Sequence, residues 1–237
     1  MSIIPKKWDP SWNDFMNTNN LNELKNIEKN IGNDFFPEEQ NVLRFINNDL
    51  SKIKCIIVGM EPYCTSSKKD GKIIPEATGR SFEVNSLRDK TWDEKFRQSS
   101  LRNIVKTIYF NETGKIDSIE NIRKNIKEKK FEILNPGEWF DKMEENGVLF
   151  LNATLTVKPN VVDSHTKIWD TFINNLINYI IQKNPDVVWL LWGNKAQDRF
   201  LPLINENKAI CSSHPRLAKF VEENCFQYVK NINWRGI

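Results

Sequence analysis

The sequence predicts an α/β protein of three layers, in which helices cover both faces of a four-stranded, mainly parallel central sheet. Two observations lead to this prediction. Four short apolar runs, each about as long as a buried strand, occupy residues 53–58, 148–151, 187–192 and 209–211. A segment with helical periodicity lies between the second and third runs, and strands that alternate with helices form parallel sheets.

The clearest helix in the sequence runs from Trp169 to Ile180. Its apolar residues recur at three- and four-residue spacing, as expected for one buried face: Trp169, Phe172, Ile173, Leu176, Ile177 and Ile180. Residues 65–77 are expected to form a polar, lysine-bearing loop, and residues 103–146 hold a second long polar stretch. The charged run at 123–130 within it is typical of a solvated helix face, with phosphate contact as the alternative.

The length of 237 residues suits a single domain over residues 1–237, with residues 1–50 as a helical extension packed on it. Trp8 and Trp12 are expected to anchor this extension, and Pro37 to open a helix whose inner side is apolar. No apolar run approaches the roughly 20 residues that span a bilayer, and the N-terminus does not resemble a signal peptide. We expect a monomer without membrane association, in the cytoplasm or, in a eukaryote, the nucleus.

Charge and cysteine content set limits on the chemistry. The net charge of +3, from 34 basic and 31 acidic residues, is too small to establish nucleic-acid binding by itself. The four cysteines (Cys55, Cys64, Cys211 and Cys225) form no CxxC pair, which excludes zinc-ribbon spacing. Cys55 and Cys211 lie in apolar runs and are expected to be buried, so an iron–sulfur cluster is disfavoured. The cysteine pattern therefore does not indicate a zinc ribbon or an iron–sulfur cluster.

Polar residues follow all four expected strands. Glu61, Asn152, Asn194 and His214 each come at or just after the end of an apolar run. Because ligands bind beyond the carboxyl ends of parallel strands, these residues are expected to converge on one site. Strand ends are often polar for structural reasons alone, so each residue also has a simpler interpretation: a solvated Glu61, a capping Asn152 and a structural His214.

The turns after the strands carry more specific signals. Gly59-Met60-Glu61-Pro62-Tyr63 would form a rigid turn that presents a carboxylate and an aromatic ring to a cleft. In Thr78-Gly79-Arg80-Ser81-Phe82, the ring of Phe82 could stack on a planar ligand, although a core position is the better interpretation of this segment taken alone. Ser212-Ser213-His214-Pro215 places an imidazole that could donate a hydrogen bond to a developing anion.

In combination, these segments resemble the family 1 uracil-DNA glycosylases. The resemblance runs from about Ile53 to Trp234 and is strongest at 147–157 (GVLFLNATLTV), at Ser164-His165 and at 189–197 (WLLWGNKAQ). It implies a monofunctional DNA repair enzyme that flips deoxyuridine out of DNA, hydrolyses its N-glycosidic bond without a metal or cofactor and leaves an abasic site. The implied partner is uracil-containing DNA; an inhibitor protein or a replication partner remains open.

The resemblance also implies roles for individual residues. Glu61 would orient the attacking water, and His214 would donate a hydrogen bond to the departing uracil anion. The backbone near Met60 would line the pocket, Tyr63 would exclude the thymine methyl, Phe82 would stack on the base and Asn152 would read its edge. Phosphate or duplex contacts would come from the following residues: Ser100, Ser164, Ser213, Arg216, Leu217 and Lys219.

Three positions depart from the family pattern. Glu61 stands where the family has Asp, and one extra methylene can displace the carboxylate by about 1 Å, enough to lower a rate roughly 100-fold. Cys64 replaces a histidine, and residues 65–77 are longer than usual. The loop that wedges into DNA reads His214-Pro215-Arg216-Leu217-Ala218, so either Leu217 or Ala218 would be the wedge.

These departures leave alternatives. One is a glycosylase for another modified base. A second is a DNA-binding replication-accessory protein with weak or lost catalysis. An unrelated α/β hydrolase is disfavoured because the sequence contains no GxSxG motif.

Overall fold

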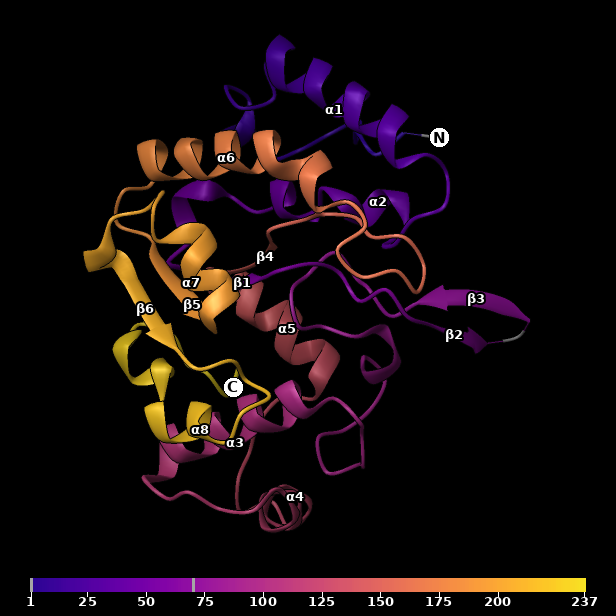
Figure 1. The fold of residues 1–237 in the computed structure, drawn as a ribbon. Helices are drawn as coiled ribbons and strands as arrows, with labels where there is room; N and C mark the ends of the chain where they lie inside the picture. The colour runs from indigo at the N-terminus through magenta and orange to yellow at the C-terminus, as the bar shows by residue number, and fades with distance from the viewer. Residues whose placement is uncertain (1, 70) are drawn as a thin grey trace.

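The computed structural model describes residues 2–69 and 71–237, and its centre is a four-stranded sheet (Figure 1). The strands are β1 (Cys55–Gly59), β4 (Val148–Asn152), β5 (Val188–Trp192) and β6 (Ala209–Ser212), in the order β4-β1-β5-β6. All three pairings are parallel. The four predicted apolar runs therefore form the strands, and the predicted sheet is confirmed.

Helices cover both faces of the sheet, which confirms the three-layer prediction (Figure 1). They are α1 (Thr18–Ile31), α2 (Glu39–Val42), α3 (Ser99–Thr113), α4 (Ile119–Lys127), α5 (Pro136–Glu145), α6 (Thr166–Lys183), α7 (Asn194–Phe200) and α8 (Lys219–Glu223). Short 3₁₀ turns occupy Pro10–Trp12, Arg44–Asn47, Leu50–Lys52, Asn85–Leu87, Glu206–Lys208 and Cys225–Tyr228.

Side chains of each strand alternate between two apolar cores, as a pleated strand requires. Ile56, Leu149 and Trp189 belong to the core shared with α1, α6 and α7. Ile57 and Phe150 belong to the core shared with α3, α5 and α8. The predicted apolar face of α6 is fully buried in the first of these cores. Burial on both faces explains why the strand sequences are continuously apolar.

The N-terminal segment packs on α6, with α1 lying over it in Figure 1. Trp12 is fully buried, and its indole N–H donates to the carbonyl of Asn48 at 2.7 Å. Tyr179 of α6 donates its hydroxyl to the Ser11 carbonyl at 2.7 Å. The helix expected after Pro37 is only the four-residue α2, which passes into a 3₁₀ turn, while its apolar residues are buried as expected: Val42, Leu43 and Phe45.

Two sequence predictions are wrong. Residues 65–77 are not a loop, because β2 (Ser66–Lys69) and β3 (Lys72–Pro75) pair as an antiparallel hairpin that projects from the body (Figure 1). Gly71, with φ of +75°, adopts the left-handed conformation that a tight hairpin turn needs. Cys211 is exposed rather than buried, because β6 is an edge strand with one side open to solvent.

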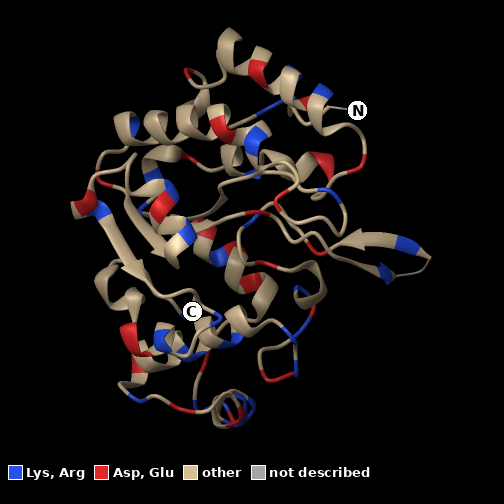
Figure 2. Cartoon of the chain, viewed as in Figure 1, with Lys and Arg blue, Asp and Glu red and all other residues tan. Residues whose placement is uncertain are grey.

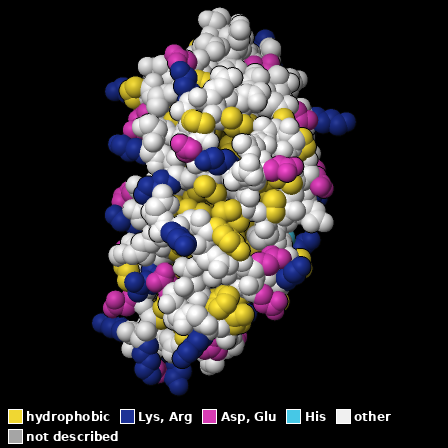
Figure 3. All heavy atoms as spheres, turned by 90° about the vertical axis from the view of Figure 1, so that its left-hand side faces the viewer, with side chains coloured by type: hydrophobic (Ala, Val, Ile, Leu, Met, Phe, Trp, Pro, Cys, Tyr) yellow, Lys and Arg dark blue, Asp and Glu magenta, His cyan; other side chains and the backbone are white. Residues whose placement is uncertain are grey.

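The charged run at 123–130 forms the second half of α4 and the turn after it, as predicted for a solvated helix. Ile122 is the residue by which α4 is buried against the body. Figure 2 shows basic residues gathered on α4 at the lower end of the molecule, whereas the face seen in Figure 3 otherwise mixes basic and acidic side chains. Among the described residues, no helix is both long and apolar enough to cross a bilayer.

The central strand β5 supplies a direct test of the two-core arrangement. Leu190 is fully buried between β1 and β6. We expect Leu190→Ala to lower the free energy of unfolding by about 2–5 kcal/mol, because it removes buried methyl groups and leaves a cavity. Ile116→Ala, at a side chain that is 54% exposed, is the control and should change it by less than about 0.5 kcal/mol. Urea unfolding of both variants measures the difference.

Candidate active site

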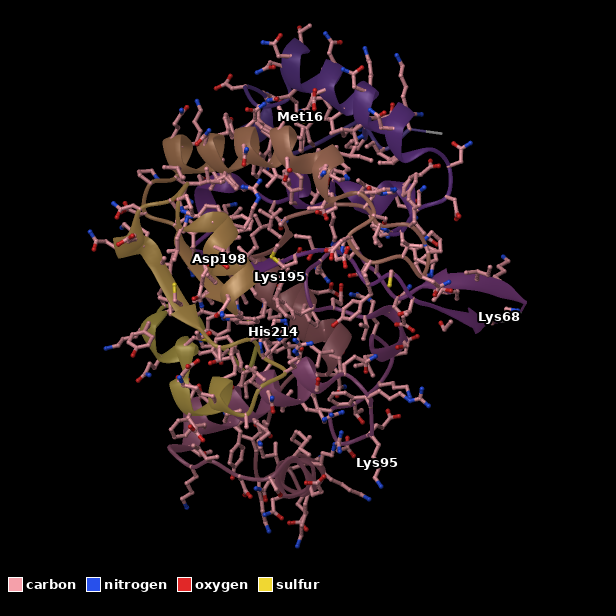
Figure 4. The ribbon with its side chains drawn as sticks, in the orientation of Figure 1. Met16, Lys68, Lys95, Lys195, Asp198 and His214 are labelled. Atoms are coloured by element: carbon pink, nitrogen blue, oxygen red, sulfur yellow. The ribbon has the colours of Figure 1, made fainter. Side chains whose placement is uncertain are left out.

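The carboxyl ends of the sheet strands open into a cavity of about 470 Å³. Seven of the residues singled out from the sequence line it: Met60, Phe82, Asn194, Ser213, His214, Arg216 and Leu217. They come from the segments after β1, β5 and β6 and from the turn before the 3₁₀ segment Asn85–Leu87. Of the four strand-end residues expected to converge, Asn194 and His214 line this cavity, whereas Glu61 and Asn152 are not among its lining residues. Lys195, at the start of α7, also lines this cavity and lies beside His214 in Figure 4.

Asn152 supplies a buried and unsatisfied polar group next to this cavity. Its side chain is 2% exposed, and Oδ1 accepts no hydrogen bond from any described residue. Asn152 pairs in register with Gly59, and a side chain at position 59 would collide with the Asn152 amide and with Ser81. Gly59 therefore leaves the space that the amide occupies. A buried acceptor without a partner is unfavourable and indicates a place for a ligand donor.

His214 is held in a defined orientation. Its Nδ1 accepts the backbone N–H of Arg216 at 3.2 Å, so in the neutral ring the proton sits on Nε2. Burial, together with the nearby Arg216 charge, lowers the pKa of His214 below its usual 6.5. Gly193 has φ of +88°, and a Cβ there would lie 2.9 Å from the His214 Cβ. The absence of a side chain at 193 thus allows the close approach of the imidazole.

Glu61 lies beside the loop that precedes α6. Its Oε2 accepts the backbone N–H of Asp163 at 2.8 Å. Lys195 is 3.8 Å from the Asp163 carboxylate, which links Glu61 to a cation on the cavity wall. Burial raises the pKa of Glu61, and Asp163 adds to this, whereas the Asp163 N–H and Lys195 act in the opposite direction. The longer Glu side chain is therefore anchored by a backbone donor.

Two aromatic residues flank this region. Phe82 is half-buried with its ring centroid 5.0 Å from that of Trp192, which fixes it against the end of β5. Its φ of +63° is an unusual backbone conformation for a phenylalanine. Tyr63 packs against the core shared with α3 and α5, and burial raises the pKa of its hydroxyl to about 12. The Tyr63 hydroxyl is therefore neutral at physiological pH.

A buried ion cluster supports the turn that carries Phe82. Arg80 is 3% exposed and bridges Glu83, Asp141 and Glu144, while Arg88 bridges Glu83 and Asp141. Burial opposes the charge of Arg80, but the hydrogen bond to Glu144 and the charge of Glu83 raise its pKa overall. Because Arg80 and Glu83 flank Phe82, the cluster holds both sides of the strained residue.

A larger cavity of about 550 Å³ opens beside this cluster, at the opposite end of the sheet. Gly147 and Ile53, which precede β4 and β1, line it together with Arg80, Asp141 and Glu144. It contains none of the residues expected to act on a ligand, and carboxylates dominate its wall. We therefore assign the candidate site to the smaller cavity at the carboxyl edge.

The residues expected to contact DNA differ in their exposure and in their contacts within the protein. Leu217 is 51% exposed at the cavity rim, and Arg216 and Lys219 are exposed beside it. Ser164 accepts the Lys158 backbone N–H at 2.8 Å. Ser100 is 9% exposed at the start of α3. These placements are compatible with contacts to a ligand for the first group and with local structural roles for both serines.

Ser213, which is expected to contact a phosphate, is hydrogen-bonded to an acidic side chain of the protein itself. Its backbone N–H and its hydroxyl both donate to the carboxylate of Glu223, at 2.5 Å and 2.9 Å. A phosphate would have to compete with this carboxylate for the same two donors. His165, the other histidine, is 1% exposed and has its Nδ1 2.9 Å from the hydroxyl of Thr156, which also accepts the Trp169 indole N–H. His165 is therefore part of the core.

Sequence reasoning missed three residues of this region. Lys195 follows the end of β5 by three positions, so its place after a strand was a usable signal. Asn103 and Glu223 lie within helices and contact the loop at 213–219 only through tertiary packing. No local sequence pattern identifies such contacts. Among the described residues, no group of three or more His, Cys, Asp or Glu side chains is arranged to hold a metal ion.

Curated proteins from several bacteria are similar to this chain in sequence. A curated protein from Mesomycoplasma hyopneumoniae, named uracil-DNA glycosylase, is 28% identical over 193 residues, which cover 79% of this chain and 71% of the relative. One of the same name from Francisella tularensis is 29% identical over 187 residues, covering 78% and 70%. No family model matches the chain. The chain is thus similar in sequence to curated proteins named uracil-DNA glycosylase, at 26–29% identity over roughly three quarters of its length.

Solved uracil-DNA glycosylases share the fold. The structure from Nitratifractor salsuginis matches with a TM-score of 0.72 and 20% identity, covering 94% of this chain and 91% of that one. The mimivirus structure matches with a TM-score of 0.62 and 23% identity, covering 90% and 70%. A variant of the mimivirus protein was solved in complex with UGI. The chain thus shares the fold of these solved uracil-DNA glycosylases.

The ion cluster behind Phe82 can be tested by neutralising its central acid. Glu83 is 1% exposed and contacts both Arg80 and Arg88. We expect Glu83→Gln to lower the free energy of unfolding by about 3–5 kcal/mol, because the buried Arg80 and the partly buried Arg88 both lose a buried carboxylate and keep only the carboxylates of α5. Glu145→Gln removes an exposed ion pair with Lys142 on α5 and should cost less than about 1 kcal/mol. Equal losses in urea unfolding would contradict the role assigned to the cluster.

Proposed function

We propose that this protein excises uracil from DNA by hydrolysing the N-glycosidic bond of a flipped deoxyuridine, leaving an abasic site. The observation that carries the proposal is the unsatisfied Oδ1 of the buried Asn152, beside a cavity walled by Phe82 and His214. Homology to proteins named uracil-DNA glycosylase supports the same reaction. Flipping is needed because the glycosidic carbon cannot be reached inside a base stack.

Asn152 accounts for base selection. An amide offers an acceptor and a donor side by side, which match the N3–H and O4 of uracil. Cytosine presents the opposite pair, so it would leave buried polar groups of the site unpaired, a large penalty. Phe82, fixed against Trp192, supplies a ring face for stacking. The rigid turn that carries Tyr63 would place this ring where the 5-methyl of thymine must enter.

Glu61 and His214 account for the hydrolysis. The Glu61 carboxylate, held by the Asp163 N–H, would orient the attacking water and stabilise positive charge on the sugar. As the glycosidic bond breaks, its electron pair passes to the base, and the negative charge reaches O2 of uracil. His214, neutral and protonated on Nε2, would donate a hydrogen bond to that oxygen. Its lowered pKa keeps this donor neutral at pH 7.

The exposed residues around the cavity would hold the DNA. Arg216, Lys219 and Lys195 can contact phosphates, which makes binding weaker as salt rises. Leu217 is a large apolar side chain, 51% exposed at the rim, and its size and position favour it over Ala218 as the wedge. Inserting an apolar side chain compensates for the stacking that the flipped base loses.

The direct test is release of free uracil from a single-stranded oligonucleotide that contains one deoxyuridine. We expect release by the wild-type protein and a decrease of about 100-fold or more in kcat for Glu61→Gln, which keeps the shape but removes the charge. Binding to the same oligonucleotide should be retained in Glu61→Gln, because the substitution leaves the exposed cations in place.

The outcomes separate the alternatives. If the wild-type protein binds DNA but releases no uracil even at high enzyme concentration, the excision proposal is wrong and a DNA-binding accessory role gains support. Preferential release of another modified base from a panel of oligonucleotides would instead indicate a glycosylase of different specificity.

The pH dependence of kcat/KM gives a second test. Glu61 acts as a carboxylate, so kcat/KM should fall as the pH drops through its folded-state pKa, which burial raises above 4.5. Lys195 lowers that pKa, so Lys195→Gln should move the acid limb to higher pH. Lys208→Gln, which removes an ion pair with Asp186, is the control and should leave the limb in place. A limb that is unmoved or shifted to lower pH in Lys195→Gln contradicts the assignment to Glu61.

A further inference from the structure

The segment from Ser213 to Lys219 carries His214 and the proposed wedge. Its first residue is held by two hydrogen bonds to Glu223, which we call the Glu223 clamp. Glu223, the last residue of α8, receives the backbone N–H of Ser213 on Oε2 at 2.5 Å. It receives the Ser213 hydroxyl on Oε1 at 2.9 Å. Both carboxylate oxygens are therefore engaged by the one residue that immediately precedes His214.

A second clamp, formed by Asn103, holds residues 215–217 of the same segment. The side-chain amide of Asn103, on α3, donates to the carbonyl of Pro215 at 2.6 Å and to that of Leu217 at 3.2 Å. Between the two clamps, the Arg216 backbone N–H donates to Nδ1 of His214. The turn that fixes the imidazole is thus bounded by Glu223 on one side and Asn103 on the other.

Charge makes Glu223 the stronger of the two clamps. Hydrogen bonds to an ionised carboxylate are about twice as strong as those between neutral groups. Lys219 lies 3.6 Å from the Glu223 Oε1, on the same face of α8. The side chain of Glu223 is only 27% exposed, so solvent competes little for its two oxygens. A neutral amide in its place would keep one acceptor oxygen and present an NH2 donor to the other Ser213 donor, so one of the two hydrogen bonds would be lost in this geometry.

We propose that Glu223 is a positioning residue, which fixes the Ser213–His214 backbone so that the His214 ring faces the cavity with its proton on Nε2. This inference rests on the proposed function, because it assigns a purpose to the placement of His214. Glu223 does not touch the cavity and acts through Ser213. When Glu223 is removed, the turn loosens and the His214 donor is displaced from the departing base.

The helix supplies a matched control. Glu222 is the neighbouring residue on α8, is exposed, and forms no hydrogen bond or ion pair with 213–219 among the described contacts. Glu223→Gln and Glu222→Gln therefore change the net charge equally, but only the first breaks the clamp. Ser213→Ala removes one of the two donors from the other side and provides a second variant should Glu223→Gln be unstable.

The experiment measures uracil release, DNA affinity and the ¹⁵N chemical shifts of His214 in each variant. We expect Glu223→Gln to lower kcat by about 10- to 100-fold with little change in the affinity for an oligonucleotide that lacks deoxyuridine. The His214 signals should change from a single Nε2–H tautomer to a mixture. Glu222→Gln should match the wild type in all three, and Ser213→Ala should be intermediate.

Several results would overturn the inference. An unchanged kcat and tautomer in Glu223→Gln would show that the clamp is only structural. A gain in DNA affinity with unchanged kcat would show that Glu223 instead competes with a phosphate for Ser213. Failure of the proposed function is separate, since it appears as no uracil release by the wild-type protein, and the tautomer of His214 is measured without catalysis.

Discussion

The parallel pairing of β1 with both β4 and β5 is the interaction on which the rest of the structure depends. Its register places Gly59 opposite Asn152 and aligns the ends of all three strands at one edge. The side chains of these strands then divide between two apolar cores that attach the helices. A slip of one residue would exchange the two faces and carry Asn152 away from the cavity.

Two glycines leave the space that the polar side chains of the site occupy. Gly59 and Gly193 lack the side chains that would collide with Asn152 and His214, respectively. The space brings an unsatisfied amide acceptor and a neutral imidazole donor to neighbouring parts of one edge. The hydrogen-bonding groups of Asn152 and His214 are complementary to the polar edges of a planar base. Recognition of the base and catalysis would therefore depend on the same cavity, from which a bound base excludes water.

Two sets of charged contacts stabilise the loops at the carboxyl edge of the sheet. The buried cluster around Arg80 supports the turn of Phe82, and Glu223 fixes the segment that carries His214. Glu61 is anchored in the same manner by a backbone N–H from the loop before α6. In each case a charged group stabilises a loop whose backbone is otherwise irregular. This arrangement allows a long and divergent set of loops to present defined side chains.

The sequence by itself determined the four strands, the α6 helix and the strand-end residues, because apolar periodicity and the ends of apolar runs are local properties of the chain. It did not determine the β2–β3 hairpin, the exposure of Cys211 or the contacts of Asn103 and Glu223. Edge position and contacts between residues far apart in the chain arise only when the layers assemble. The tertiary structure therefore decided how Glu61 and Ser213 are held, since their partners lie 102 and 10 residues away on other elements, whereas the contact of His214 with the Arg216 N–H is local to its turn.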